Sequence, residues 1–237
     1  ERIADELSLK LGIRVSPRTV GGYLDRRRPP GGRATNQRWA TIVRNHAKGI
    51  VACDFMVSVT ASMRVLYVFV AMEVGSRRIL HTNVTAHPTA EWTLQQFRKC
   101  LADDHPSRFL IHDRDSMFSA NLDSELKCFG LRVLKTPVRA PKSNAHCERL
   151  IGTIRRECLD FLIPLNERHL RRLLSEFVTH YNRGRPHSAL GPGIPELPQA
   201  KVPVGPHRHK LPAGYRVAST PVLGGLHHEY RLEKEAA

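Results

Sequence analysis

The sequence predicts an α/β protein whose core is a mixed five-stranded sheet flanked by helices. Residues 50–84 hold three apolar or alternating runs joined by short turns, as in an antiparallel meander. Residues 88–162 then alternate helical patterns with short buried strands. Antiparallel strands followed by strand–helix crossovers indicate a mixed sheet with helices on both faces. A chain of 237 residues with 41% hydrophobic content can bury one such core.

Residues 1–25 are expected to form a partial helix-turn-helix. Apolar residues between Ile3 and Leu11 repeat at helical spacing, and Ser16 followed by Pro17 can begin a second helix. Two consecutive glycines weaken that second helix, so a plain helical hairpin remains an alternative. Residues 26–37 are rich in Arg, Pro and Gly, which predicts a basic linker that can also touch phosphates.

The core is expected to cover residues 38–195. Thr89 is a candidate N-cap for the first helix after the meander. Strands are predicted at residues 50–59, 65–74, 77–84, 108–112 and 131–136, and helices at 88–103, 119–129, 143–162 and 166–182. Repeated Pro and Gly then predict an irregular C-terminal tail over residues 196–237.

The charge of the chain indicates a polyanionic partner. Its formal net charge is +15, from 37 Lys and Arg against 22 Asp and Glu. Most of the excess is arginine, whose planar fork suits phosphate oxygens, so nucleic acid is the leading partner. An arginine-rich composition without such a partner is the alternative, and motifs must decide between them.

Other classes of protein are disfavoured by composition. The sequence contains no run of roughly 18 apolar residues, so we expect no membrane span, and its acidic first residues do not resemble a signal peptide. A soluble cytoplasmic protein is expected. The five cysteines are widely spaced without a C-x-x-C pair, which favours reduced structural thiols over disulfides or a zinc finger.

Three carboxylates occupy positions where an α/β sheet can bring them together. Asp54 lies within an apolar run that predicts a central strand, Asp113 follows a short buried strand, and Glu148 lies early in a helix. Each has an ordinary alternative: a paired buried Asp, a turn residue and a solvated helix face, respectively. Asp115 is an alternative to Asp113, because either can point into a cleft.

Taken together, the three acids predict a metal site. Acids at a strand, a strand end and a helix can converge on one edge of the sheet and hold two divalent ions. Two Mg²⁺ ions about 4 Å apart can activate an attacking oxygen and stabilise a leaving one in phosphoryl transfer. Such a site would explain the cost of burying Asp54.

At this point the residues resemble the catalytic core shared by retroviral integrases and bacterial insertion-sequence transposases of the Asp-Asp-Glu class. The resemblance rests on Asp54 in the first strand and on residues 111–118 and 140–158, with 34 residues between Asp113 and Glu148. Residues 86–92 and 181–190 resemble the bacterial transposases in particular. The likeness covers roughly residues 38–195, which are thus identified as an integrase-like catalytic core.

This resemblance implies an RNase H-like fold and a polynucleotidyl transferase. Water and then a DNA 3′-hydroxyl would attack phosphodiesters in line, nicking element ends and joining them to target DNA, as in transposition, DNA integration and DNA recombination. Carried over by position, Asp54, Asp113 and Glu148 bind two Mg²⁺ ions, for which Mn²⁺ can substitute. Residues expected to contact DNA are Asn144, Arg155 and Arg156, together with Lys142 and Arg149 beside the glutamate.

The same resemblance implies a homo-oligomer assembled on DNA and a nucleoid-associated location in a bacterial cell. Two alternatives remain at this point. One is an RNase H-like nuclease that cuts without joining, and the other is a catalytically silent DNA-binding relic, which the shortened helix-turn-helix region favours.

Overall fold

The computed structural model describes residues 15–24, 33–101, 105–113, 117–118, 120–135, 144–190, 193–196 and 211–235. The chain divides into two compact units, Glu1–Thr41 and Ile42–Ala237. In the first unit, helix α2 (Pro17–Leu24) begins as predicted, because the Ser16 hydroxyl accepts the backbone N–H of Thr19 at 3.1 Å. The other predicted helix, from Ile3 to Leu11, lies outside the described residues.

Helix α3 (Arg33–His46) corrects the predicted linker. Residues 33–37 were assigned to the linker, but they form the beginning of this helix. The linker was inferred from helix-breaking residues, and between Arg33 and Lys48 the sequence contains neither proline nor glycine. Residues 25–32 lie outside the described part of the chain.

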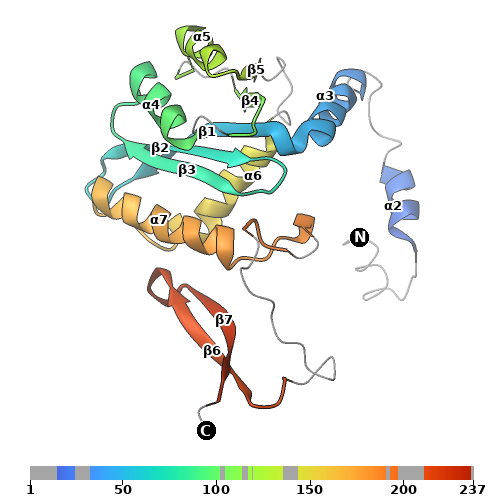
Figure 1. Ribbon diagram of the computed structural model, residues 1–237, viewed down its shortest axis with the longest axis vertical. Coiled ribbons are helices and arrows are strands. Elements are labelled where there is room, and N and C mark those ends of the chain that lie inside the picture. The colour runs from blue at the N-terminus through green and yellow to red at the C-terminus, as the bar shows by residue number, and fades with distance from the viewer. Residues whose placement is uncertain are drawn as a thin grey trace. The chain divides into compact units, whose positions relative to one another are not determined.

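The second unit contains the predicted mixed five-stranded sheet (Figure 1). Its order is β3-β2-β1-β4-β5, in which β1–β3 are antiparallel and β4 and β5 run parallel to β1. The strands are β1 (Ile50–Val59), β2 (Val65–Glu73), β3 (Ile79–Thr85), β4 (Phe109–His112) and β5 (Arg132–Lys135). Strand β1 is therefore central, as its apolar run predicted.

Helices cover both faces of the sheet. On one face, Val51 and Cys53 pack with Phe69 against α4 (Ala90–Cys100) and α5 (Ala120–Cys128), in a core that includes Phe97 and Leu126. The predicted N-cap of α4 is confirmed, because the Thr89 hydroxyl accepts the N–H of Trp92 at 3.1 Å. Alternation along β1 turns Ala52 and Asp54 to the opposite face, where α6 (Ala145–Ile154) packs behind β2 and β3 in Figure 1.

The predicted helix over residues 143–162 is interrupted. Helix α6 ends at Ile154, and the next residues, Arg155–Leu159, form a π-helical turn, η3. The one-turn change of hydrogen bonding shifts the direction in which the following side chains leave the helix. A periodicity-based prediction cannot see this change, because the apolar residues continue at nearly helical spacing.

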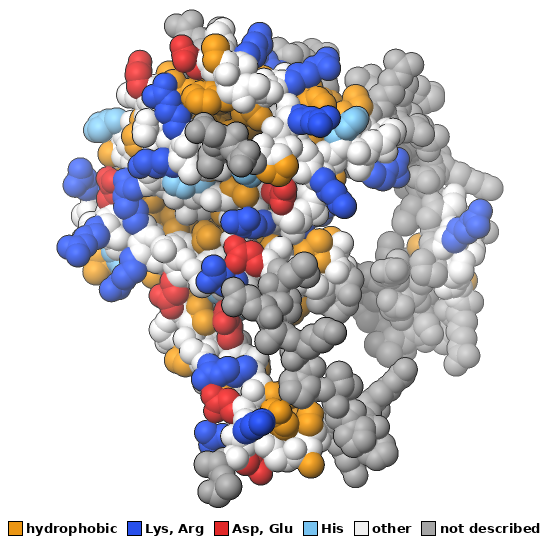
Figure 2. Space-filling view, in the orientation of Figure 1, with side chains coloured by type: hydrophobic (Ala, Val, Ile, Leu, Met, Phe, Trp, Pro, Cys, Tyr) orange, Lys and Arg blue, Asp and Glu red, His pale blue; other side chains and the backbone are white. Residues whose placement is uncertain are grey.

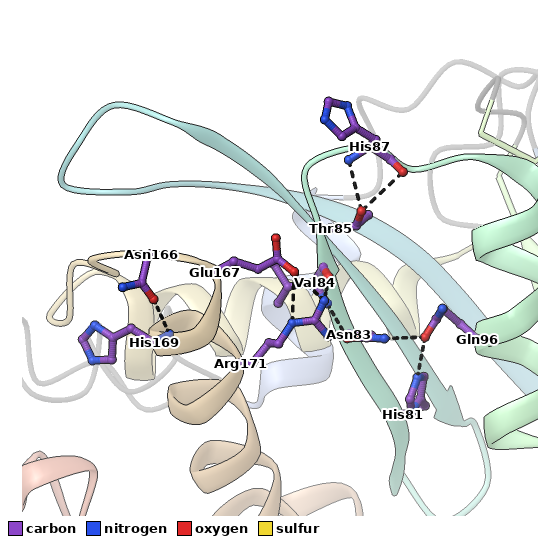
Figure 3. Close-up of polar contacts among 10 residues, drawn as sticks. All are labelled: His81, Asn83, Val84, Thr85, His87, Gln96, Asn166, Glu167, His169 and Arg171. Atoms are coloured by element: carbon purple, nitrogen blue, oxygen red, sulfur yellow. Dashed lines mark hydrogen bonds and ion pairs between the residues drawn. The ribbon is translucent and has the colours of Figure 1, made fainter.

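Helix α7 (Glu167–Arg183) lies against the edge strand β3 (Figure 3). The guanidinium of Arg171 donates to the Asn83 side chain and to the carbonyl of Val84. At the other end of β3, Asn182 accepts the N–H of Ile79 at 2.9 Å and donates to its carbonyl at 3.0 Å. These bonds satisfy backbone groups that an edge strand otherwise exposes.

The predicted irregular tail is wrong for the described residues 211–235, which contain a β-hairpin. Strands β6 (Tyr215–Val222) and β7 (His227–Lys234) pair antiparallel in register from Tyr215–Lys234 to Val222–His227. The tip of the hairpin turns through Gly224 and Gly225, both of which have positive φ. All residues of these two strands are exposed or half-buried, so the buried-strand pattern used for prediction is absent from the hairpin. Within the described residues, no helix combines the length and the apolar character that a membrane crossing requires.

Candidate active site

Asp54 lies in β1 on the face of the sheet that α6 covers. Its Oδ1 accepts the N–H of Phe55 at 2.8 Å, and its Oδ2 lies 3.4 Å from the amide nitrogen of Asn144. The first four residues of β1 are buried, whereas Asp54 and Phe55 are half-buried and Val57 is exposed. The carboxylate thus lies where the buried half of the strand ends, and it is less desolvated than the apolar run predicted.

Asp113 occupies the corresponding position beside the neighbouring strand. Ala52 of β1 pairs with Ile111 of β4 in parallel register, and Asp54 and Asp113 each follow two residues later. Because side chains alternate along a strand and adjacent strands lie about 4.8 Å apart, extending this register by two residues would turn the two carboxylates to the same face of the sheet. The carbonyl of Asp113 accepts the Nδ1–H of His112 at 2.5 Å, which helps fix the strand end.

Glu148 is brought toward this pair by Asn144 at the start of α6. Asn144 occupies the N-cap position, but its side chain makes no capping bond. Its amide instead donates to the carbonyl of Cys53 at 3.1 Å, in the middle of β1. Glu148 follows one helical turn later, its N–H bonded to the carbonyl of Asn144 at 3.0 Å, so the two residues share a helix face.

All three acids act on one buried thiol between α6 and β1. Burial raises the pKa of Cys147 well above its usual value, and the negative charges of Asp54, Glu148 and Asp113 raise it further. The neighbouring Cys53 thiol has a raised pKa for similar reasons, burial first. These fully buried thiols therefore stay protonated, as is typical of structural cysteines, and of the two only Cys147 is affected by all three carboxylates.

The chemistry of these side chains fits a hard divalent cation. Carboxylate oxygens are the ligands that Mg²⁺ prefers, and Mg²⁺ is commonly held by one or two carboxylates plus substrate phosphates. The buried Oδ1 of Asn144 also has no hydrogen-bond partner within the described residues, so an acceptor beside Asp54 remains unsatisfied. Among those residues no three His, Cys, Asp or Glu form a ready-made metal cage. Asp54, Asp113 and Glu148 are therefore not gathered into a ready-made metal site, and we call the part of β1, β4 and α6 that carries them the carboxylate edge.

The predicted DNA contacts are spread around α6. Arg149 and Arg155 are exposed, and Arg155 also reaches the carbonyl of Val57 at 3.5 Å. The exposed Arg156 guanidinium lies across Gly152, with Nη1 2.9 Å from where a Cβ would stand. Asn144 is buried and faces β1, so its position is better suited to holding Asp54 than to direct contact with DNA. Lys142 and the alternative ligand Asp115 lie outside the described residues.

A second group of polar side chains, which the sequence did not reveal, lines a cavity of about 180 Å³ on another side of α6. We call it the α6 basic pocket. Met72 and Leu150 supply apolar surface, and the charged or polar lining includes Arg77, His146, Arg149, Tyr181, Arg185 and His187. These residues come from the β2–β3 turn, from α6 and from the end of α7 onward. No local sequence motif predicts that these side chains line the same cavity.

Comparison with known proteins gives three similarities. Residues 130–195 match the family described as Integrase core domain. Over 171 residues, or 69% of this chain, the sequence is 28% identical to a protein of Escherichia coli K12 assigned as the InsD transposase of insertion element IS2E, of which the match covers 77%. The same identity is found with the InsD transposase of IS2A/D/F/H/I/K from Escherichia coli, of which the match covers 56%. The chain spans little more than half the length of that relative.

The third similarity concerns the fold. A chain of the simian T-cell lymphotropic virus intasome, solved in complex with the PP2A regulatory subunit B56 gamma, aligns with a TM-score of 0.51 and 14% sequence identity. The alignment covers 80% of this chain and 79% of that chain. At this level of identity the likeness supports a common fold alone.

Proposed function

We propose that this chain, an InsD-like transposase in sequence with a retroviral-integrase-like fold, nicks and joins DNA using divalent metal ions held by Asp54, Asp113 and Glu148. One observation carries the proposal: Asp54 in β1 and Asp113, which directly follows β4, each come two residues after the paired residues Ala52 and Ile111 of these adjacent parallel strands. Asn144 ties the helix that carries Glu148 to the same point of β1. Ligands of α/β proteins commonly gather at such strand ends.

Bound Mg²⁺ ions would supply charge neutralisation for the attacking and leaving oxygens of a phosphodiester, and Mn²⁺ is expected to substitute. The chain's own residues have the task of holding and orienting the reactants. Asn144 keeps the Asp54 carboxylate in place, and the paired strands fix Asp113 beside it. Lys and Arg side chains are spread across the face seen in Figure 2, which suits a DNA backbone.

The remaining assignments follow from the same proposal. Residues 1–25 would contribute to end recognition as part of a helix-turn-helix, of which α2 is the described helix. Residues 38–195 would form the catalytic core. The partners would be element ends and target DNA, with several copies of the chain assembled on that DNA.

The test uses the full chain and a labelled duplex that carries inverted repeats flanking its coding region. With Mg²⁺ we expect both nicked and joined products. Asp54→Asn and Glu148→Gln should each lower both products by roughly 100-fold or more, because each removes a ligand of the reacting centre. Glu125→Gln is the charge-matched control and should react normally, because it changes an exposed carboxylate on α5, which packs on the face of the sheet opposite to α6.

Each other outcome selects a different conclusion. Equal activity of both variants would show that these acids are not the ligands. Nicked product without joined product would select a nuclease. Salt-dependent DNA binding without Mg²⁺-dependent cleavage would select a DNA-binding relic.

A further inference from the structure

The α6 basic pocket holds more positive charge than its own residues neutralise. Arg185 forms a bidentate ion pair with Glu157, in which Nε lies 2.6 Å from Oε2 and Nη2 lies 2.6 Å from Oε1. Within the described part of the chain, Arg77 and Arg149 have no carboxylate at ion-pair distance. Arg77 instead donates to Nδ1 of His146. Two guanidinium groups thus line one cavity without a counter-ion from the described residues.

The cost of this arrangement is visible at Arg77, which is half-buried. Burial lowers the pKa of Arg77, and the positive charge of Arg149 lowers it further. A half-buried charge beside a second charge of the same sign is unfavourable unless something neutralises it. A packing role does not explain them, since uncharged side chains could fill this space without the repulsion. A bound anion would offset both the burial and the repulsion.

The remaining lining is suited to an anion as well. Because Nδ1 of His146 accepts the bond from Arg77, its other ring nitrogen carries a hydrogen and is a donor. The Arg185 guanidinium lies 5.7 Å from the centre of the Tyr181 ring, and its pairing with Glu157 fixes its position. A volume of about 180 Å³ suits a single phosphate group and is smaller than the pockets of about 300 Å³ or more that hold larger ligands.

We propose that the α6 basic pocket binds one backbone phosphate of the DNA strand, through Arg77 and Arg149, beside the strand segment that reaches the carboxylate edge. This inference rests on the proposed function for the identity of its ligand. Arg149 directly follows Glu148, and successive helical side chains diverge by about 100°. One turn of α6 therefore presents its acid to the reacting centre and its arginine to the pocket.

The test measures binding of a labelled generic duplex to the full chain without divalent ions, at several salt concentrations. Each phosphate neutralised contributes about 0.9 to the slope of log affinity against log salt. Arg77→Gln and Arg149→Gln should each reduce the steepness of that slope by about 1, and affinity by roughly tenfold at 0.1 M salt. The double variant should also lose only about 1, because both arginines serve one phosphate.

Two controls separate the pocket from general positive charge. Arg132→Gln removes an exposed arginine at the amino end of β5 and should leave the slope unchanged. Arg149→Lys keeps the charge and should keep most of the slope. Thermal unfolding of every variant shows whether it has folded.

A single methylphosphonate, which neutralises one phosphate, is then moved along one strand of the inverted-repeat duplex, whose sequence is expected to fix the register of binding. At one position it should weaken wild-type binding and leave Arg77→Gln unaffected. Any of three results would overturn the inference. The first is an unchanged slope in both single variants, and the second is a loss of about 2 in the slope of the double variant. The third is a methylphosphonate penalty that persists in Arg77→Gln at every position. If the arginine variants keep the wild-type slope and the wild-type chain nicks and joins DNA, the pocket proposal alone is rejected. If the variants show the predicted slopes and the wild-type chain does not cleave DNA, the catalytic proposal alone is rejected.

Discussion

Asn144→Asp is the sharpest test of how α6 is joined to the carboxylate edge. The amide of Asn144 donates to the carbonyl of Cys53 at 3.1 Å and lies 3.4 Å from Oδ2 of Asp54. The substitution keeps the size of the side chain, removes both donors and adds a negative charge to a residue that is 4% exposed. Each of these changes has a cost that can be worked out.

Loss of the bond to Cys53 leaves a buried carbonyl unpaired, at a cost of about 1–3 kcal/mol. Two carboxylates separated by 3.4 Å repel by about 5 kcal/mol at an effective dielectric constant of 20, although proton uptake by the pair limits this penalty. We therefore expect Asn144→Asp to lower the free energy of unfolding by roughly 3–5 kcal/mol. Asn144→Ala, the uncharged control, removes the whole amide group without adding a charge and should cost about 1–3 kcal/mol.

Urea denaturation of both variants in EDTA measures the difference between them, which is the contribution of the added charge. Repetition in Mg²⁺ should narrow that difference, because a cation at the carboxylate edge offsets the repulsion and stabilises the folded state by mass action. If the two variants unfold at the same urea concentration in EDTA, the side chain of residue 144 does not face Asp54, and the proposed geometry of the site is refuted.

Three further predictions concern the surrounding fold. Gly152→Ala places a Cβ 2.9 Å from Nη1 of Arg156, and the guanidinium can move away. Thermal unfolding should therefore show a gain in stability of up to about 1 kcal/mol from helix propensity. If Arg156 contacts DNA, the same variant should also bind DNA more weakly. Thr89→Ala removes the cap of α4 and should cost about 1 kcal/mol in urea denaturation; an unchanged midpoint would contradict the capping bond. Burial raises the pKa of Glu157, but its hydrogen bonds and ion pair with Arg185 outweigh burial and lower it overall. Its stabilising contribution is therefore present at neutral pH and lost as pH falls below about 4.3, the unfolded value, and Glu157→Gln should flatten that part of the stability profile.

The central strands could be predicted because each forms a continuous apolar run in the sequence. Strand β1 is apolar on both faces over its first four residues, and β2 is buried over most of its length, so each reads as a continuous apolar run. The placement of Asp113 followed from the same reasoning, since a carboxylate directly after a short buried strand lies at its carboxyl end. The register between β1 and β4, from which the relation of Asp113 to Asp54 follows, could not be read from the sequence, because it pairs residues that are 59 positions apart.

The features that were missed depend on contacts between distant segments. Most residues of β6 and β7 are exposed or half-buried, so the hairpin carries no apolar run. It is held by polar contacts instead, including His180 with Glu229 at 2.8 Å and His227 with the carbonyl of Glu157 at 2.6 Å. The α6 basic pocket likewise joins Arg77 to residues more than 65 positions later in the chain.

The first turns of α6 explain how an acid and a base can adjoin in sequence without neutralising each other. Side chains on a helix pair at spacings of three and four, and adjacent residues do not face each other. No cation stands at those spacings from Glu148, where the sequence has Asn144, Ala145, Ile151 and Gly152. No acid stands at those spacings from Arg149, where it has Ala145, His146, Gly152 and Thr153. An ion pair along the helix would have neutralised both charges, so this spacing leaves the carboxylate and the guanidinium available for the metal ion and the phosphate that we propose.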